Sequence, residues 1–170
     1  PTLQGSFTID PGATFIGPAG SHHIGGDWIN NGLFTYRNDN TIVFNTTKVA
    51  SIAGTSPTGF NSFVLDKGST IASILTVNNV ITIAKYLGFS NGLLNIPTGG
   101  SVTVNYKGPD ISSTSGLDVN GGTFNTIGVP LTNAGLFRIS GGAANIGTVP
   151  GNSLDNNSGG VFDMSGGTLN

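Results

Sequence analysis

The 170-residue sequence contains no cysteine and no glutamate, and it has only one glutamine, one methionine and six lysine or arginine residues. Without cysteine, the chain can form neither a disulfide nor a thiolate metal site. The unbranched side chains that favour helices are scarce, which argues strongly against a helical fold. No run of 18 apolar residues occurs, so the sequence predicts no membrane span.

Charged residues are equally scarce. The six basic and eight acidic residues give a net charge of −2 at pH 7, and no basic cluster is present. Nucleic-acid binding depends largely on neutralising phosphates with clustered lysine and arginine. We therefore expect no nucleic-acid partner.

The chain is rich instead in glycine (28), threonine (20), asparagine (19) and serine (16), which together make up almost half of its residues. The apolar share of 36% is too high for a disordered linker. The composition therefore predicts an all-β protein with many glycine-containing turns. No shift in composition marks a domain boundary, so we expect a single segment over residues 1–170.

The second half repeats one phrase of nine residues, which reads apolar, any, apolar, Ser or Asn, Gly or Asn, Gly, any, apolar, Asn. Its four copies are residues 87–95, 117–125, 137–145 and 162–170, and their starts lie 30, 20 and 25 residues apart. A constant strand–turn–strand phrase with unequal spacers is typical of a β-solenoid. We predict a right-handed parallel β-helix with irregular loops between its rungs.

Stacking the four copies predicts which residues share a column. Alternation along each strand should give three inward apolar columns. These are Leu87, Leu117, Phe137 and Phe162; Phe89, Val119, Ile139 and Met164; and Leu94, Phe124, Ala144 and Leu169. One rung cannot bury these side chains alone, whereas the stack can.

Two further columns form an expected structural ladder. Its amide side chains, which can hydrogen-bond from rung to rung, are Asn95, Asn125, Asn145 and Asn170. Its glycines occupy a bend that needs either a positive φ or room for the neighbouring rung, and they are Gly92, Gly122, Gly142 and Gly167.

The second position of each copy predicts an outward row. The row reads Gly88, Asp118, Arg138, Asp163. Rung spacing would place Arg138 about 4.8 Å from a carboxylate on either side. Alternating signs favour an exposed ion-pair ladder, which contributes about 0.2–1 kcal/mol per pair, over a catalytic carboxylate pair.

Few other residues are candidates for chemistry. His22, His23 and Asp27 form the one plausible metal cluster, in a stretch from Pro18 to Asp27 that we expect to be a long loop. Adjacent histidines of a strand point apart, so we predict neither a metal site nor a cofactor. Because nucleophile-elbow and phosphate-loop motifs are missing as well, we predict no enzyme.

The aromatic residues could serve either in ligand binding or in packing. A sugar-stacking platform would require Trp28, Tyr36, Tyr86 and Tyr106 to share one outer face. For Trp28 a place in the core or the cap of the solenoid is the better expectation. Surface Thr, Ser and Asn could hydrogen-bond glycans, but they also simply solubilise a chain with few charges.

A series of short motifs begins with Trp28-Ile-Asn-Asn-Gly-Leu-Phe34 and continues with Asn40-Thr-Ile-Val-Phe-Asn45, Leu75-Thr-Val77, Ile81-Thr-Ile83 and Gly92-Leu-Leu-Asn95. With these motifs, residues 28–170 resemble the repeats of large secreted surface proteins of the Bacteroidota. The later Gly-Gly-Thr phrases are similar to β-helical autotransporter passengers. This resemblance implies export, often by the type IX route, and a role in adhesion, gliding or the cell-surface matrix.

The resulting expectation is a structural or adhesive module, an extracellular rod at the cell surface. Its expected partners are the remainder of a longer repeat protein, surface glycans and, for an export substrate, outer-membrane secretion machinery. Two alternatives stay open from the sequence. One is a polysaccharide-acting β-helix enzyme, and the other is a segment of a trimeric fibre similar to a phage tail spike.

Overall fold

The computed structural model describes residues 2–147 and 153–170, and these residues form strands and turns without a helix. One sheet joins 17 strands, a second joins two, and the strand pairs are parallel. Partners along a side are 19 to 25 residues apart, as Ile74 with Leu93 and Ala50 with Leu75 show. The chain therefore winds as a β-solenoid of about seven turns, which confirms the predicted fold class.

Each turn has three sides, which we name A, B and C. Side A contains β1 (Thr2–Leu3), β4 (Gly20–Ile24), β7 (Asn40–Phe44), β13 (Asp110–Ile111), β15 (Leu131–Asn133) and β17 (Leu154–Asn156). Side B contains β2 (Phe7–Ile9), β5 (Trp28–Asn30), β8 (Ala50–Ala53), β10 (Ile74–Val77) and β18 (Val161–Met164). Side C contains β3 (Thr14–Ile16), β6 (Leu33–Thr35), β12 (Ser101–Val104) and β19 (Thr168–Leu169).

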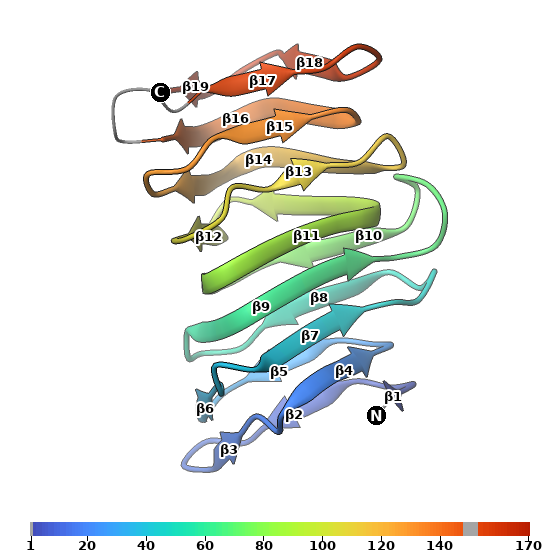
Figure 1. The fold of residues 1–170 in the computed structure, drawn as a ribbon. Helices are drawn as coiled ribbons and strands as arrows, with labels where there is room; N and C mark the ends of the chain where they lie inside the picture. Colours follow the sequence, from blue (N-terminus) through green and yellow to red (C-terminus); the bar gives the residue numbers. More distant parts are fainter. Residues whose placement is uncertain (1, 148–152) are drawn as a thin grey trace.

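Four long strands continue around a corner and belong to more than one side. These are β9 (Thr58–Asp66), β11 (Val80–Pro97), β14 (Ser115–Thr126) and β16 (Leu136–Ile146). In Figure 1 the nearer strands, such as β4, β7 and β9, run left to right, and the fainter strands behind them return. Because the chain climbs from the N-terminus at the bottom to the C-terminus at the top, the winding is right-handed.

The core is a single hydrophobic cluster that extends from Ile9 to Ile146. Alternating residues of each strand point inward, so the inner columns consist of fully buried side chains such as Leu75, Leu117 and Phe137. Near the N-terminus the core is aromatic, and the Trp28 ring lies 4.8 Å from both Phe7 and Phe34.

A glycine stack forms the corner between sides B and C in the later turns. Its members are Gly100, Gly122, Gly142 and Gly167. A Cβ atom on Gly122 would lie 2.5 Å from the carbonyl oxygen of Pro97 and 2.6 Å from that of Gly100. At Gly122 the need is thus for room, and the positive φ of this bend falls on Gly121 (+95°). Only glycine lets consecutive rungs approach so closely.

The expected alignment of the first copy, residues 87–95, is wrong. Leu87 pairs with Phe63 on side A and Phe89 pairs with Ile111, rather than with the side B strands of the later copies. Leu94 instead pairs with Leu117, and Asn95 with Asp118. Gly88 and Gly92 therefore lie outside the columns in which the sequence placed them.

The alignment is wrong because two different corners of the coil are both formed by glycine. Gly92, with φ +95°, bends the chain between sides A and B, whereas the later copies bend between sides B and C. The true first copy is residues 94–103, where Gly100 joins the glycine stack and Thr103 pairs with Asn125. One extra residue before Gly100 hides this copy from a simple alignment of the phrase.

The expected long loop from Pro18 to Asp27 is also wrong, because it contains strand β4. This strand pairs with β1 below and β7 above, and it buries Ile24 in the core. Within β4 only Ile24 is strongly apolar, so the alternation that identifies a strand is weak in the sequence.

Candidate functional site

One outward column of side B runs the whole length of the solenoid. From bottom to top it reads Ser6, Asp27, Ser51, Thr76, Asn95, Asp118, Arg138, Asp163. Near its lower end, Asp27 accepts hydrogen bonds from the Ser51 backbone N–H (2.8 Å) and hydroxyl (3.0 Å). The column mixes hydroxyl, amide and charged groups, so contacts along it favour one register.

The strongest polar contact of this column joins Asp118 and Arg138. Arg138 Nη2 donates to Asp118 Oδ2 at 2.6 Å, and the Asp118 side chain is only 7% exposed, against 37% for Arg138. The row was predicted to be an exposed ladder, and the carboxylate of Asp118 is buried instead. The hydrogen bond that Arg138 donates to Asp118 raises the pKa of Arg138, with a further contribution from the negative charge of Asp163.

This arrangement favours a role in fixing the register of the rungs over a role in acid–base chemistry. The Asp118 carboxylate accepts from Arg138 and, at 3.4 Å, from the Ser140 hydroxyl. Both carboxylate oxygens of Asp118 are thus occupied by hydrogen bonds within the stack, which leaves them poorly placed for acid–base chemistry on a substrate. Asp163, in the next rung, is exposed and pairs in register with Arg138.

An amide ladder lies on the outside of side C. Asn170 Nδ2 donates to Asn145 Oδ1, and Asn145 Nδ2 donates to Asn125 Oδ1, each at 2.7 Å. At the base of the ladder, Asn125 Nδ2 donates to the Thr103 hydroxyl at 3.2 Å. Asn95 is not a member, because it lies on side B beside Asp118.

The exterior of side C carries no charge across its upper turns. Its two outward columns are Val80, Ser101, Thr123, Ala143 and Thr168, and Thr82, Thr103, Asn125, Asn145 and Asn170. Small hydroxyl, amide and methyl groups therefore repeat at the rung spacing of about 4.8 Å. Such a surface offers fixed hydrogen-bond donors and acceptors to a neutral partner.

A groove of about 480 Å³ runs along the corner between sides A and B. Its walls include the hydroxyls of Thr70 and Thr114 and the apolar side chains of Ile71 and Val161, and no charged residue lines it. No sequence pattern predicts this groove, because it forms only where the corner loops of successive rungs stack above the longer segment 67–73.

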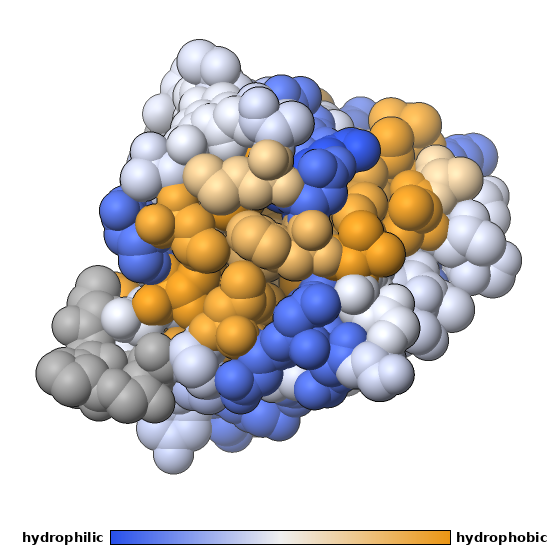
Figure 2. All heavy atoms as spheres, turned by 90° about the horizontal axis from the view of Figure 1, so that it is seen from above, coloured by the Kyte–Doolittle hydropathy of each residue, from blue (hydrophilic) through white to orange (hydrophobic). Residues whose placement is uncertain are grey.

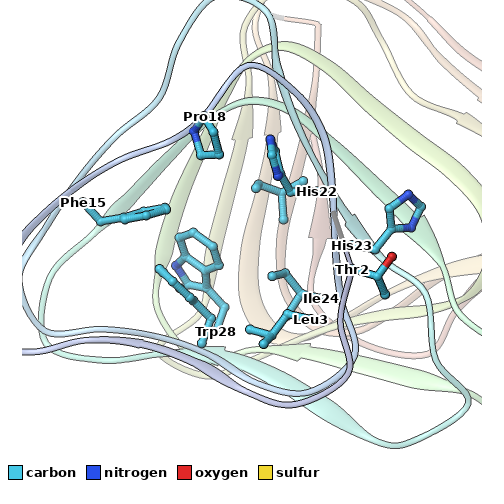
Figure 3. A pocket seen from close by; sticks show the side chains of 10 residues that line it. Thr2, Leu3, Phe15, Pro18, His22, His23, Ile24 and Trp28 are labelled. Carbon is cyan, nitrogen blue, oxygen red and sulfur yellow. The ribbon is translucent and has the colours of Figure 1, made fainter.

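His22 and His23 point to opposite sides of the coil, as Figure 3 shows. Inside, His22 Nε2 lies 2.9 Å from the Ala19 carbonyl oxygen, while His23 Nδ1 lies 3.0 Å from Asn45 Nδ2. Asp27 is engaged with Ser51. Among the described residues, no three His, Cys, Asp or Glu side chains converge on a point where a metal ion could bind.

Inward residues at the bottom of the solenoid surround a hollow of about 380 Å³ (Figure 3). Leu3, Phe7, Phe15 and Trp28 are among the side chains that line it, and His22 adds one imidazole. The hollow is the open lower end of the core, which no rung below covers in the described residues. No sequence pattern predicted this hollow.

The tyrosines and Trp28 do not form one platform. Trp28 is 1% exposed and belongs to the core. The Tyr86 ring covers Gly88 on side A, and Lys107 Nζ lies 5.1 Å from its centroid. Tyr36 instead lies against Gly59 on side C, and Tyr106 is 73% exposed at the corner between these sides.

Lys67 is the least expected buried group. It follows β9 directly, its side chain is fully buried, and its Nζ has no hydrogen-bond partner within the described residues. Burial lowers the pKa of Lys67, and the negative charge of Asp27 opposes this shift in part. Nothing in the sequence distinguishes this lysine from the five other basic residues.

In the described ranges there is no helix of the length and apolarity needed to cross a membrane. No protein-family model, no curated protein and no solved structure matches the chain.

Proposed function

We propose that this chain is a structural and adhesive module of a secreted bacterial cell-surface protein. The observation that carries the proposal is the continuity of the core, a single cluster running through about seven turns. A stack of this kind adds about 4.8 Å per turn, which gives a rod roughly 34 Å long. Such a rod can hold a contact surface away from the cell.

The exterior supports an adhesive role toward neutral polysaccharides. The two outward columns of side C are uncharged, and its amide ladder fixes Asn125, Asn145 and Asn170 at rung spacing. The groove between sides A and B is likewise free of charged side chains. The resemblance to Bacteroidota surface repeats adds export, the cell surface and the adhesion, gliding or matrix context to the proposal.

The test is to incubate the chain with insoluble neutral polysaccharides and to measure both co-sedimentation and newly released chain ends. We expect sedimentation without new chain ends. Chain-end release that Asp118→Ala with Asp163→Ala abolishes would overturn the proposal and assign a polysaccharide-acting enzyme. Absence of sedimentation from every polysaccharide would remove the adhesive part and leave a spacer rod.

A matched pair of variants locates the contact surface. Thr123→Lys places a charge on the neutral exterior of side C, and Thr76→Lys places the same charge at a half-buried position on side B. We expect Thr123→Lys to lower the sedimented fraction several-fold while Thr76→Lys leaves it unchanged. Equal losses for both variants would contradict a binding surface on side C.

A further inference from the structure

The groove of about 480 Å³ between sides A and B owes its shape to corners of unequal length. Segment 67–73, which joins β9 to β10, is the longest described corner between these sides, and in Figure 1 it projects furthest at the right-hand edge. Of the corners above it, 112–114 and 134–135 are short, whereas 157–160 is longer again. Segments 67–73 and 157–160 therefore form two lips, and the short corners form the floor between them.

The lower lip is anchored at both of its ends to the rung above. The Lys67 N–H donates to the Asn91 carbonyl oxygen at 2.9 Å, and the Ser73 carbonyl oxygen accepts from the Leu93 N–H at 2.9 Å. These bonds hold the ends of the segment in place before any ligand arrives. Binding in the groove therefore has to order little of the protein, which lowers the entropic cost of association.

The floor separates hydroxyls that hold the stack together from hydroxyls that face outward. Ser112 and Thr114 both donate to the Ser90 carbonyl oxygen, at 2.7 and 2.9 Å, and the Ser115 hydroxyl donates to the Ser112 carbonyl oxygen at 3.1 Å. Ser113 also lines the groove, but it forms none of these bonds and is exposed. Its hydroxyl can therefore bond to a ligand without breaking the stack.

The lining combines hydroxyl and aliphatic groups and carries no charge. Hydroxyls come from both lips and from the floor, as Thr70, Ser158 and Thr114 show, and Ile71 and Leu136 add aliphatic surface. Figure 2 likewise shows hydrophobic and weakly polar residues side by side at the right-hand corner of the molecule. A sugar ring has the same two kinds of surface, because hydroxyl groups project from its edge and C–H groups cover its faces. The volume also falls within the range of small-ligand sites, roughly 300–1,000 Å³.

Two other classes of ligand fit the groove less well. A nucleic acid or another polyanion would need basic side chains, and no charged residue lines the groove. An extended peptide would add to an unpaired strand edge. Strand β14, which borders the floor, already pairs with β11 below and with β16 above.

We propose that this groove binds a single neutral oligosaccharide chain, with sugar hydroxyls bonded to the serines and threonines of the corners and a ring face packed on Ile71 and Leu136. The inference rests on the proposed adhesive function and adds a second kind of contact to it. Side C offers rows of neutral side chains to the surface of an insoluble polysaccharide. The groove instead holds a short stretch of one soluble chain.

The test is isothermal titration calorimetry with soluble neutral oligosaccharides built from glucose, mannose or xylose, and with an uncharged acetylated alanine–serine peptide. Ser113→Lys places a long charged side chain in the groove, and Ser21→Lys is the matched control, because Ser21 is an exposed serine on side A. Ile71→Ser removes aliphatic surface from the lower lip at a position that is 42% exposed, so it should leave the fold intact.

We expect at least one oligosaccharide to bind the wild type, Ser21→Lys and Thr123→Lys with the same affinity. Ser113→Lys should lower that affinity at least tenfold, because it fills the groove and introduces a charge that the lining cannot pair. Ile71→Ser should lower it several-fold. Circular dichroism checks that every variant folds.

Three results would overturn the proposal. One is a wild type that binds none of the oligosaccharides, and the adhesive function would still stand if that protein sediments with insoluble polysaccharides. Another is binding that Thr123→Lys weakens and Ser113→Lys does not, which would place the site on side C. The third is binding of the alanine–serine peptide alone, which would assign a peptide groove.

Discussion

The two halves of the solenoid reach the same architecture by different means. Strands β1 to β8 have two to five residues each, their corners differ in length, and aromatic rings fill the space between them. In the later half β11, β14 and β16 span 18, 12 and 11 residues, and a glycine stack tightens the corner between sides B and C. The earlier half also needs glycine at this corner, because a Cβ atom on Gly32 would clash with the carbonyl oxygen of Ala13 and one on Gly54 with that of Asn30. The halves therefore differ in strand length and in how the core is filled, and the repeated phrase is confined to the later half.

The largest expected effect would break the corner on which the later half depends. Gly122→Val places a Cβ atom 2.5–2.6 Å from two backbone carbonyl oxygens, so the rungs must separate. We expect a loss of at least about 3 kcal/mol in the free energy of unfolding, measured by urea denaturation. The control in the earlier half is Gly5→Val, where a Cβ meets nothing within 4 Å. Similar losses for both variants would show that the loss does not come from the crowding at Gly122.

The next largest effect is expected from substituting one of two aspartates in the same outward column. Asp118→Ala removes the buried partner of Arg138, and we expect it to cost about 1–3 kcal/mol, because a charged group loses its strongest hydrogen bond. Asp27→Ala loses hydrogen bonds from the neutral Ser51 and Ser6 and should cost about 1 kcal/mol. Urea denaturation measures both, and a larger loss for Asp27→Ala would contradict the assignment of Asp118 as the anchor of the column.

A pH dependence should come from Lys67 in the earlier half. Its folded-state pKa is lowered by burial, so the unfolded chain binds more protons, and the free energy of unfolding should rise as pH increases toward about 10.5. Lys67→Met should abolish this rise and stabilise the protein at neutral pH by about 1 kcal/mol or more. Denaturation at pH 7 and pH 10 checks the prediction. A destabilised Lys67→Met at pH 7 would show that the ammonium has a stabilising partner.

The smallest effect concerns the amide ladder. Asn145→Ala removes two side-chain hydrogen bonds at a half-buried position, and we expect a loss of about 0.5–1.5 kcal/mol in urea denaturation. Asn105→Ala, at an exposed position beyond β12, is the control and should be close to neutral. Equal values for the two variants would show that the ladder orders side chains without stabilising the stack.

The later half was predictable because its chemistry repeats in the sequence. The copies at 117, 137 and 162 place Asp118, Arg138 and Asp163 in one row, and the structure pairs the same residues. The copy at 87–95 led to a wrong alignment. Glycine with a positive φ occurs at every corner of the coil, so the phrase alone does not identify which corner it forms. Alignment by the Gly-Gly pair at 99–100 would have found the correct rung.

Other features depend on packing that no local pattern records. The burial of Asp118, the orphaned ammonium of Lys67 and the groove between sides A and B all arise when distant loops stack on one another. Strand β4 was missed because its two histidines conceal the apolar alternation, although His22 points inward. Periodicity thus identifies the rungs, and only the assembled stack shows what covers each residue.

Cysteine pairs test the register of the stack most directly, because the native chain contains no cysteine. In Asn95→Cys with Asp118→Cys the two residues are direct partners on side B, and in Asn95→Cys with Asn125→Cys they lie on different sides. Neighbouring strands at about 4.8 Å fall within the Cα separation that a disulfide spans. Under mild oxidation, non-reducing mass analysis of the monomer should show a disulfide in the first pair and free thiols in the second. A disulfide in the second pair alone would contradict the register on which this account depends.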